Sequence, residues 1–448
     1  MQYEEFISEL IEKARDLGFE DCEAYLSLSN NFEVEIFKNV LEKYEKSSIS
    51  GLSFRGLYNG KMGYSYTEKI EKDVIDKLID MAKTNAILIE NEDKDFIFEG
   101  SKNYVNLEKV EIEQMSEEDK IDIAFKLEKY AEECDEKVEM VTAYVGDSES
   151  LVSLVNSKGL SLSNDNKLSY VYLDIVVKKD DEIREVYEIW AGKSLANLDL
   201  KKLAKKGVDK ALFKLGSKSV KSDKYRVILT NETVATFLKV FCSMFYGEQV
   251  QKGFSILKNR VNDEIFSDKI TLFDKGITEN SIVKSVFDSE GVATRDVTLV
   301  EKGVLKGYLY NLKSAYKADV VSTGNGFRSG YKGGISTMPK NFYIENGDVS
   351  FEKMLDELQN GLIIDDIRGM HSGANAISGQ FSLQASGKLV ENGKIVSPVD
   401  DIVISDNFLD MFKKVTLVGN DFKFDLPSSN TCFGAPSLLV ENLSVAGE

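Results

Sequence analysis

The first half of the chain repeats one order of elements, and this repeat restricts the possible folds more than any other feature. Residues 3–86 open with an amphipathic helix, continue through alternating and glycine-punctuated strand segments, and close with a second helix. Residues 117–214 follow the same order. The repeat is one of pattern rather than of identical residues. It predicts an α+β domain built from a duplicated helix–sheet–helix unit.

A polar, turn-rich segment separates this half from the rest of the chain. Residues 214–224 are rich in lysine and serine, which is typical of an exposed domain boundary. We therefore expect two domains. The first, residues 1–218, is the α+β domain with the internal repeat, and the second comprises residues 219–448.

The second half is expected to be β-rich and largely antiparallel. A strand at residues 225–229 leads into a helix for which Asn231 is the expected N-cap. From residue 269 onward, short apolar segments alternate with glycine turns, and one helix is predicted near residues 351–359.

Composition excludes several classes of partner. The chain has 448 residues, 42% of them hydrophobic, which is enough for a large core. Its 56 basic and 75 acidic residues give a net charge of −19, so its surface should repel nucleic acid. No apolar run is long enough to span a membrane, and the acidic start does not resemble a signal peptide. Four cysteines without a C-x-x-C pair are typical of reduced thiols, so we expect a cytoplasmic protein.

A single histidine, His371, limits the available chemistry. An H-E-x-x-H zinc site needs two histidines on one helical face. A serine or cysteine nucleophile with a histidine base could be built only around His371. Most familiar hydrolase mechanisms are therefore excluded.

Other candidate sites are weak. Asp365-Asp366 and Asp400-Asp401 could share a hard cation, although solvated turns explain them better. The S-x-x-K pairs Ser255–Lys258 and Ser314–Lys317 are expected by chance in a chain rich in both residues.

The stretch from residue 369 to 393 concentrates small and polar residues around the histidine. It ends in an alternating strand and an E-N-G hairpin turn at residues 391–393. These polar groups either satisfy one another in a loop or bind a ligand, and both interpretations stay open. The candidate ligand-binding residues are His371, Ser372, Asn375, Ser378 and Gln380.

This stretch resembles the signature of the TldD/PmbA family, in particular its PmbA (TldE) branch. That signature runs roughly G-x-N-x-x-[ST]-G-D-[FY]-S, then A-x-G, then E-N-G. The chain differs at Gln380, where the family usually has Asp. The likeness extends over essentially the whole chain, through residues 247–255, 324–326, 398–399, 404–407, 419–421, 435–440 and 445–447.

The resemblance implies a subunit of a two-subunit metallopeptidase system that cleaves unfolded or leader peptides. In this family, a TldD-type subunit carries H-E-x-x-x-H and a late cysteine, which bind zinc. The matching positions here are Leu238, Lys239 and Ser243, so the resemblance implies a subunit with no catalytic residue and no metal. Cys432 lies near the late cysteine, but one thiolate cannot hold a catalytic zinc. The family label "modulator of DNA gyrase" would then describe an indirect effect.

The expected partners are a TldD-type H-E-x-x-x-H subunit, which would hold the zinc, and an extended peptide. Two alternatives remain. One is a homodimeric peptide-binding protein without a catalytic partner. The other is an independent hydrolase that uses a Ser/Lys pair or a carboxylate-bound metal.

Overall fold

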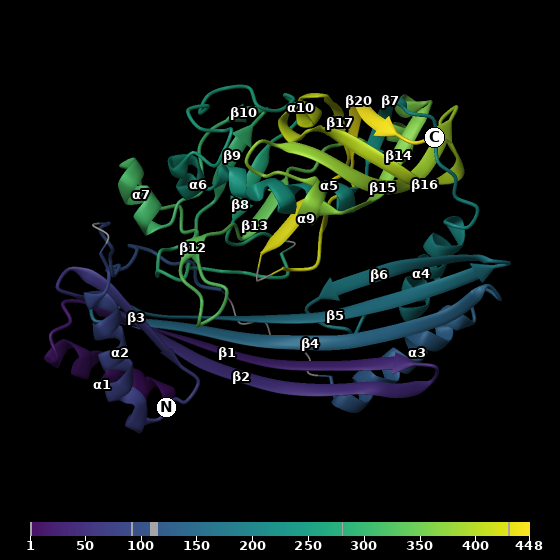
Figure 1. Cartoon of the computed structure of the whole chain (residues 1–448). Coiled ribbons are helices and arrows are strands. Elements are labelled where there is room, and N and C mark those ends of the chain that lie inside the picture. The colour runs from purple at the N-terminus through teal and green to yellow at the C-terminus, as the bar shows by residue number, and fades with distance from the viewer. Residues whose placement is uncertain (1, 91–92, 108–114, 280, 429–430) are drawn as a thin grey trace.

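The computed structural model describes residues 2–90, 93–107, 115–279, 281–428 and 431–448. Figure 1 shows a long curved sheet below a second body of shorter strands. We call α1 to α4 with β1 to β6 the N-terminal half, and β7 to β20 with their helices the C-terminal half. Among the described residues, no helix is both long enough and apolar enough to cross a membrane.

One antiparallel sheet of six strands forms the N-terminal half, in the order β3-β2-β1-β4-β5-β6. Its central pair, β1 with β4, joins the first repeat unit to the second. The strands are β1 (Cys22–Phe37), β2 (Val40–Tyr58), β3 (Lys61–Thr67), β4 (Val138–Asn156), β5 (Ser161–Lys179) and β6 (Glu182–Gly192).

Four helices cover one face of this sheet. α1 (Gln2–Asp16) and α2 (Ile75–Ile87) pack at one end, and α3 (Glu117–Glu132) and α4 (Leu200–Phe213) at the other. The even-numbered residues of β1 pack against both helix pairs, because alternate side chains of a strand point to one face. Ala24 and Leu26 are buried against α1 and α2, and Val34 and Ile36 against α3 and α4. The predicted duplicated unit is confirmed.

The C-terminal half contains two further sheets of six strands, in the orders β16-β15-β14-β7-β20-β17 and β10-β9-β8-β13-β19-β18. All pairings within them are antiparallel except β7–β14 and β13–β19. The strands of the first sheet are β7 (Asp223–Leu229), β14 (Gly361–Arg368), β15 (Gln380–Glu391), β16 (Lys394–Asn407), β17 (Val415–Val418) and β20 (Leu438–Ala446). Those of the second are β8 (Leu272–Lys275), β9 (Val297–Glu301), β10 (Val304–Leu305), β13 (Asn341–Ile344), β18 (Lys423–Phe424) and β19 (Cys432–Ala435). A small pair is formed by β11 (Gly326–Phe327) and β12 (Ser336–Thr337).

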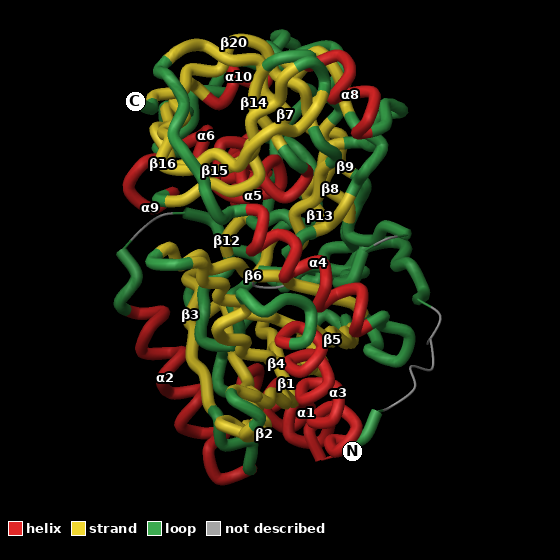
Figure 2. Tube along the Cα trace, turned by 90° about the vertical axis from the view of Figure 1, so that its right-hand side faces the viewer, coloured by secondary structure: helices red, strands yellow, loops and turns green. Residues whose placement is uncertain are grey.

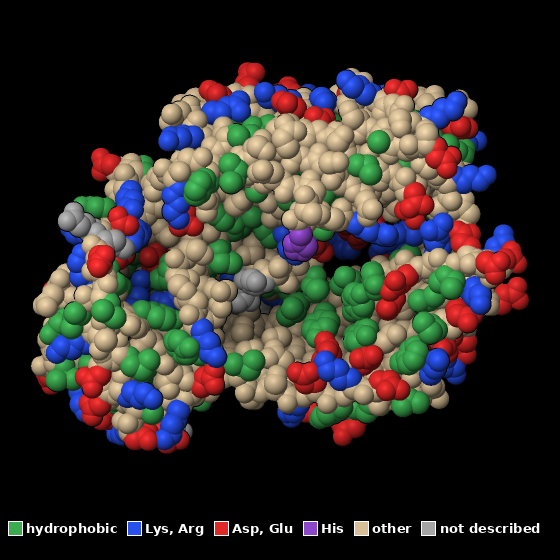
Figure 3. Space-filling model, in the orientation of Figure 1, with side chains coloured by type: hydrophobic (Ala, Val, Ile, Leu, Met, Phe, Trp, Pro, Cys, Tyr) green, Lys and Arg blue, Asp and Glu red, His purple; other side chains and the backbone are tan. Residues whose placement is uncertain are grey.

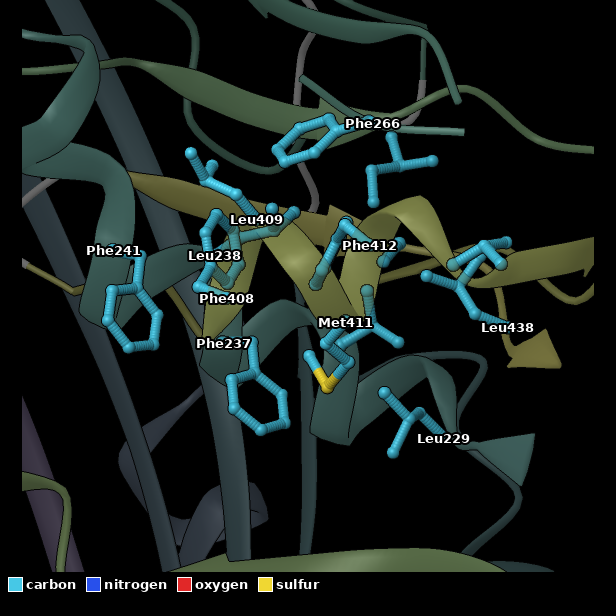
Figure 4. Packing of buried hydrophobic residues seen from close by; sticks show 14 of the residues in the cluster. Leu229, Phe237, Leu238, Phe241, Phe266, Phe408, Leu409, Met411, Phe412 and Leu438 are labelled. Atoms are coloured by element: carbon cyan, nitrogen blue, oxygen red, sulfur yellow. The ribbon is translucent and has the colours of Figure 1, made fainter. Parts of the chain in front are cut away.

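Helix α5 (Asn231–Phe241) contacts strands of both sheets and carries the centre of the core. Its Phe241 stacks on Phe408 with 4.6 Å between ring centres, and Phe408 lies 4.5 Å from Phe412. Figure 4 shows these rings packed around Leu238. The α+β prediction, with a β-rich and mostly antiparallel second half, is confirmed, whereas the domain boundary at residue 218 stays a prediction.

Two local predictions are wrong. The N-cap of α5 is Thr230, whose hydroxyl accepts from Thr233 N at 3.4 Å, because the helix begins one residue earlier than expected. The region after residue 269 contains more helices than the single one predicted, which is α8 (Phe351–Leu358). The others are α7 (Leu312–Ala318), α9 (Met370–Gly373) and α10 (Phe408–Lys413), which span too few residues to show helical periodicity.

Candidate functional site: the cleft between the halves

A cleft of about 1230 Å³ separates the two halves. It is lined by β6 and α4 from below, and by α5, the end of β14 and β18 from above. Figure 2 shows α4 at this junction, and Figure 3 shows the surface hollowed between the halves. Residues 183–191 of β6 all line the cleft. Because β6 is the last strand of its sheet, one of its edges pairs with no other strand among the residues that the structure describes.

Four lysines at intervals of four residues line the cleft: Lys202, Lys206 and Lys210 of α4, and Lys214, its C-cap. Lys206 Nζ lies 2.5 Å from a Glu188 carboxylate oxygen. Lys210 and Lys214 face acidic groups of the C-terminal half, at 3.9 Å from Glu232 and 3.8 Å from Asp366. Burial lowers the pKa of Lys214. Lys210 and Lys214 therefore connect the two walls of the cleft by ion pairs.

Along β4, β5 and β6, tyrosines and acids alternate with core residues. They therefore lie on the face of the sheet opposite the helices. Tyr144 lies edge-on to Tyr172 with 5.5 Å between ring centres, and Tyr172 stacks on Tyr187 at 5.2 Å. Beside them, burial and the nearby Glu185 raise the pKa of Asp174 to about 6. Tyr187 also lines the cleft. Aromatic faces and an exposed strand edge suit the binding of an extended chain.

The predicted residues of the 369–380 stretch lie next to this cleft rather than in its lining. His371 and Ser372 belong to α9, and only the neighbouring Met370 lines the cleft. The histidine, purple in Figure 3, lies at the edge of the hollow. Its side chain is exposed.

The remaining predicted residues share one turn. Asn375 Oδ1 accepts hydrogen bonds from Ile377 N at 2.9 Å and Ser378 N at 3.1 Å, and Ser378 Oγ accepts from Gln380 N at 3.4 Å. These contacts shape the loop, as expected if its polar groups satisfy one another. Gln380 is exposed. Whether any of the five binds a ligand stays a prediction.

The residues at the H-E-x-x-x-H positions do not fit zinc. Leu238 is fully buried in the core and has no lone pair, Lys239 is an exposed cation, and Ser243 lies in a 3₁₀ turn at residues 242–245. Cys432 is buried, and burial raises the pKa of its thiol to about 11. Within the described ranges, no group of three His, Cys, Asp or Glu side chains could hold a metal.

The other sequence candidates have structural roles. Ser255 Oγ donates to Met244 O at 2.7 Å, and Ser314 completes the capping box of α7. The expectation that Asp365-Asp366 and Asp400-Asp401 lie in turns is wrong, because both pairs lie in strands. Asp366 accepts from Arg368, and Asp400 from Arg184 across the halves at 3.2 Å.

Comparison with known families shows to which family the chain belongs. Three models match in order: PmbA/TldA metallopeptidase domain 1 at residues 22–86, the central domain at 111–215 and the C-terminal domain at 222–447. The last of these spans about half of the chain. The chain belongs to the PmbA/TldD family.

Relatives match this PmbA/TldD member over nearly its full length. A Thermotoga maritima protein described as a candidate modulator of a DNA gyrase is 32% identical, with a TM-score of 0.90 over 99% of this chain and 100% of that one. TldE from Thermococcus kodakarensis shares the fold, with a TM-score of 0.91 at 24% identity over 99% of this chain and 100% of that one. A metalloprotease of Methanocaldococcus jannaschii is 26% identical over 93% of each chain. The resemblance seen in the sequence is thus confirmed.

Sequence reasoning missed the cleft lining. The four-residue spacing of the α4 lysines is visible in the sequence and could have been noticed. The Tyr172–Tyr187 stack depends on the pairing of β5 with β6, and the Lys210–Glu232 contact joins the two halves. Neither contact has a local signal in the sequence.

Proposed function

We propose that this PmbA/TldD-family chain is a metal-free, PmbA/TldE-type subunit that binds extended peptides, and that a separate TldD-type subunit supplies the zinc and cleaves. The observation that carries this proposal is the buried Leu238, with Lys239 beside it, where the family's zinc ligand and general base would stand. A buried leucine cannot hold a metal, and a protonated lysine cannot accept a proton.

The proposed peptide lies in the cleft along β6. The free edge of this strand offers main-chain hydrogen bonds, as in other proteins that bind a peptide by strand addition. Tyr187, which is 45% exposed, and the neighbouring tyrosines offer apolar surface to the peptide side chains. The 369–380 loop, with His371 and Gln380 exposed, borders the cleft from above.

Metal content and reconstitution test whether this chain binds the peptide while a separate subunit supplies the zinc. Elemental mass spectrometry of untagged protein should find less than about 0.1 equivalent of zinc, because structural and catalytic zinc sites bind tightly enough to survive purification. Peptide cleavage should require addition of an H-E-x-x-x-H paralogue encoded in the same genome. About one equivalent of zinc, or cleavage by this chain alone that a chelator stops, would contradict the proposal. A stable homodimer that binds peptide with no such paralogue in the genome would favour the partner-free alternative.

Two variants test the peptide site. Tyr187→Ala should weaken peptide binding about five- to tenfold, which corresponds to the loss of one aromatic contact. Tyr66→Ala is the matched control, because Tyr66 is 44% exposed and lies on β3 at the opposite edge of the sheet. His371→Ala should lower the activity of the subunit pair without changing the melting temperature. A large fall in melting temperature instead would show that His371 is structural.

A further inference from the structure

A second, smaller cavity lies farther along the same face of the N-terminal sheet. Its free volume is about 50 Å³, and a buried water takes about 10–15 Å³ in this measure, so it has room for a few waters or one small ion. Its floor includes Asn164 and Asn166 of β5, and its roof comes from the C-terminal half. The two halves are in direct contact here, since Asn164 Nδ2 donates to Lys284 O at 3.1 Å.

Lys340 lines this cavity and is only 6% exposed. Its Nζ lies 4.8 Å from the centre of the Phe327 ring. Among the residues that the structure describes, none makes a hydrogen bond or ion pair with this ammonium. Burial lowers the pKa of Lys340 to about 8, although Cys432 and Asp274 partly offset this effect. A buried cation without a hydrogen-bonded counter-ion is costly to fold, so its presence requires an explanation.

The other polar groups of the cavity do not supply the missing anion. The carboxylate oxygens of Asp288 already accept from the backbone N–H groups of Glu290, Val292 and Gly326 at 2.8 to 3.0 Å. Burial also raises the pKa of Asp288, which favours its neutral form. Asn166 uses its Oδ1 to accept from Lys284 N at 2.9 Å, and no described residue accepts a hydrogen bond from its NH₂ group. The cavity therefore combines the Lys340 ammonium, the neighbouring Arg328 guanidinium and a hydrogen-bond donor in a space for a few atoms.

We propose that this cavity binds one carboxylate, with Lys340 Nζ as its counter-charge and the Asn166 amide as a second donor. A carboxylate has three non-hydrogen atoms, which suits a space of a few waters. It gains a charge-assisted hydrogen bond that a neutral ligand would lack. The carboxylate belongs either to a small free acid or to the C-terminus of a peptide, and the site itself does not depend on the proposed function.

Calorimetric titration at constant ionic strength tests the site. Sodium acetate should bind the full-length protein at a stoichiometry near one, and sodium benzoate should not, because the ring exceeds the cavity. Lys340→Met should strongly weaken acetate binding, although Arg328 still lines the cavity, and Lys340→Arg should retain more of it. Lys275→Met is the matched control: Lys275 lies on β8 opposite Asn341, pairs with Asp296 at 3.2 Å and does not line the cavity. It removes the same charge and should leave acetate binding intact.

Tetrapeptides with a free or an amidated C-terminus distinguish the two sources. If the protein binds the free-acid peptide at least about tenfold more tightly than the amidated one, and Lys340→Met loses this preference, the ligand is a peptide terminus. A tenfold difference in affinity equals about 1.4 kcal/mol. Equal binding of both peptides, with acetate binding still dependent on Lys340, identifies a free acid. If acetate and the free-acid peptide both fail to bind, or bind Lys340→Met as they bind the wild type, the proposal is wrong.

Stability provides a second measurement. Without ligand, Lys340→Met should raise the melting temperature, because it replaces an unpaired buried cation by an apolar side chain of similar length. A lower melting temperature would show that groups already present stabilise the ammonium, and it would count against the site. Failure of peptide cleavage with the zinc paralogue would overturn the proposed function but leave these results unaffected.

Discussion

At the scale of single residues, Asp274 shows how burial changes the chemistry of an ordinary side chain. It is 2% exposed, and its carboxylate accepts from Asn325 Nδ2 at 2.6 Å and from the backbone N of Lys340 at 2.7 Å. Burial nevertheless raises its pKa to about 7. The desolvation of the charged form outweighs two hydrogen bonds that favour it.

The pKa of Asp274 predicts a specific pH dependence of stability. Between about pH 4 and 7 the folded chain keeps a proton that the unfolded chain loses, so stability should fall as pH rises through this range. For one proton the slope is at most about 1.4 kcal/mol per pH unit. Above pH 7 both states are ionised and this contribution becomes constant.

Urea unfolding at several pH values measures this slope. Asp274→Asn should remove it, whereas Asp268→Asn, at a carboxyl that is 77% exposed, should not. Asp174, whose pKa is raised to about 6, contributes in the same direction, so the comparison is between variant and wild type. An unchanged slope in Asp274→Asn would show that this residue is ionised in the folded chain well below pH 7.

At the scale of elements, helix α5 shows how one cap positions the centre of the molecule. Thr230 directly follows the last residue of β7 and caps α5, and its side chain accepts from Thr233 N. Asn231, the residue expected to cap, instead donates from Nδ2 to Asp421 O at 2.7 Å. The cap sets where α5 leaves the sheet, and hence where Phe237 and Leu238 enter the core.

Loss of this cap should be measurable. Thr230→Ala should lower the free energy of unfolding by about 1 kcal/mol, the usual cost of removing a helix N-cap. Thr230→Ser keeps the hydroxyl and should cost much less. Chemical denaturation provides the measurement. Equal losses for alanine and serine would indicate that the threonine methyl group, rather than the cap, is responsible.

At the scale of the whole molecule, a buried charge cluster joins the two halves. Arg328 of the C-terminal half lies 3.1 Å from Glu23 of β1, which also binds Arg55 of β2 at 2.8 Å. The side chains of Arg328 and Glu23 are 1% and 0% exposed. Arg328 also lies over the Tyr25 ring at 4.5 Å. One guanidinium thus connects the sheet to the body above it.

Removal of this arginine should weaken the contact between the two halves. Arg328→Met should cost about 3–5 kcal/mol, as expected when one partner of a buried pair is removed. Arg368→Met, at a 55% exposed arginine paired with Asp366, should cost at most about 1 kcal/mol. Urea unfolding followed by circular dichroism, with limited proteolysis between the halves, compares the two. Similar small losses for both would show that the cluster contributes little to the interface.

The sequence predicted the elements and the family well because their signals are local. Helical and alternating periodicities identified the duplicated unit, and the E-N-G turn at residues 391–393 does connect β15 to β16. The α5 cap was wrong by one residue because Thr230 and Asn231 are both good caps. Short helices such as α10 were missed because six residues show too little periodicity.

By itself, the sequence determined the fold class, the family and the absence of histidines at the H-E-x-x-x-H positions, since these depend on residue order along the chain. Only the tertiary structure decided that Arg328 reaches Glu23. It also decided that, within the described part of the chain, Lys340 faces a cavity that offers it no hydrogen-bonded counter-ion and β6 presents an unpaired edge to the cleft. Such contacts join residues up to 305 positions apart. The packing of whole sheets sets them, and no local pattern of residues encodes that packing.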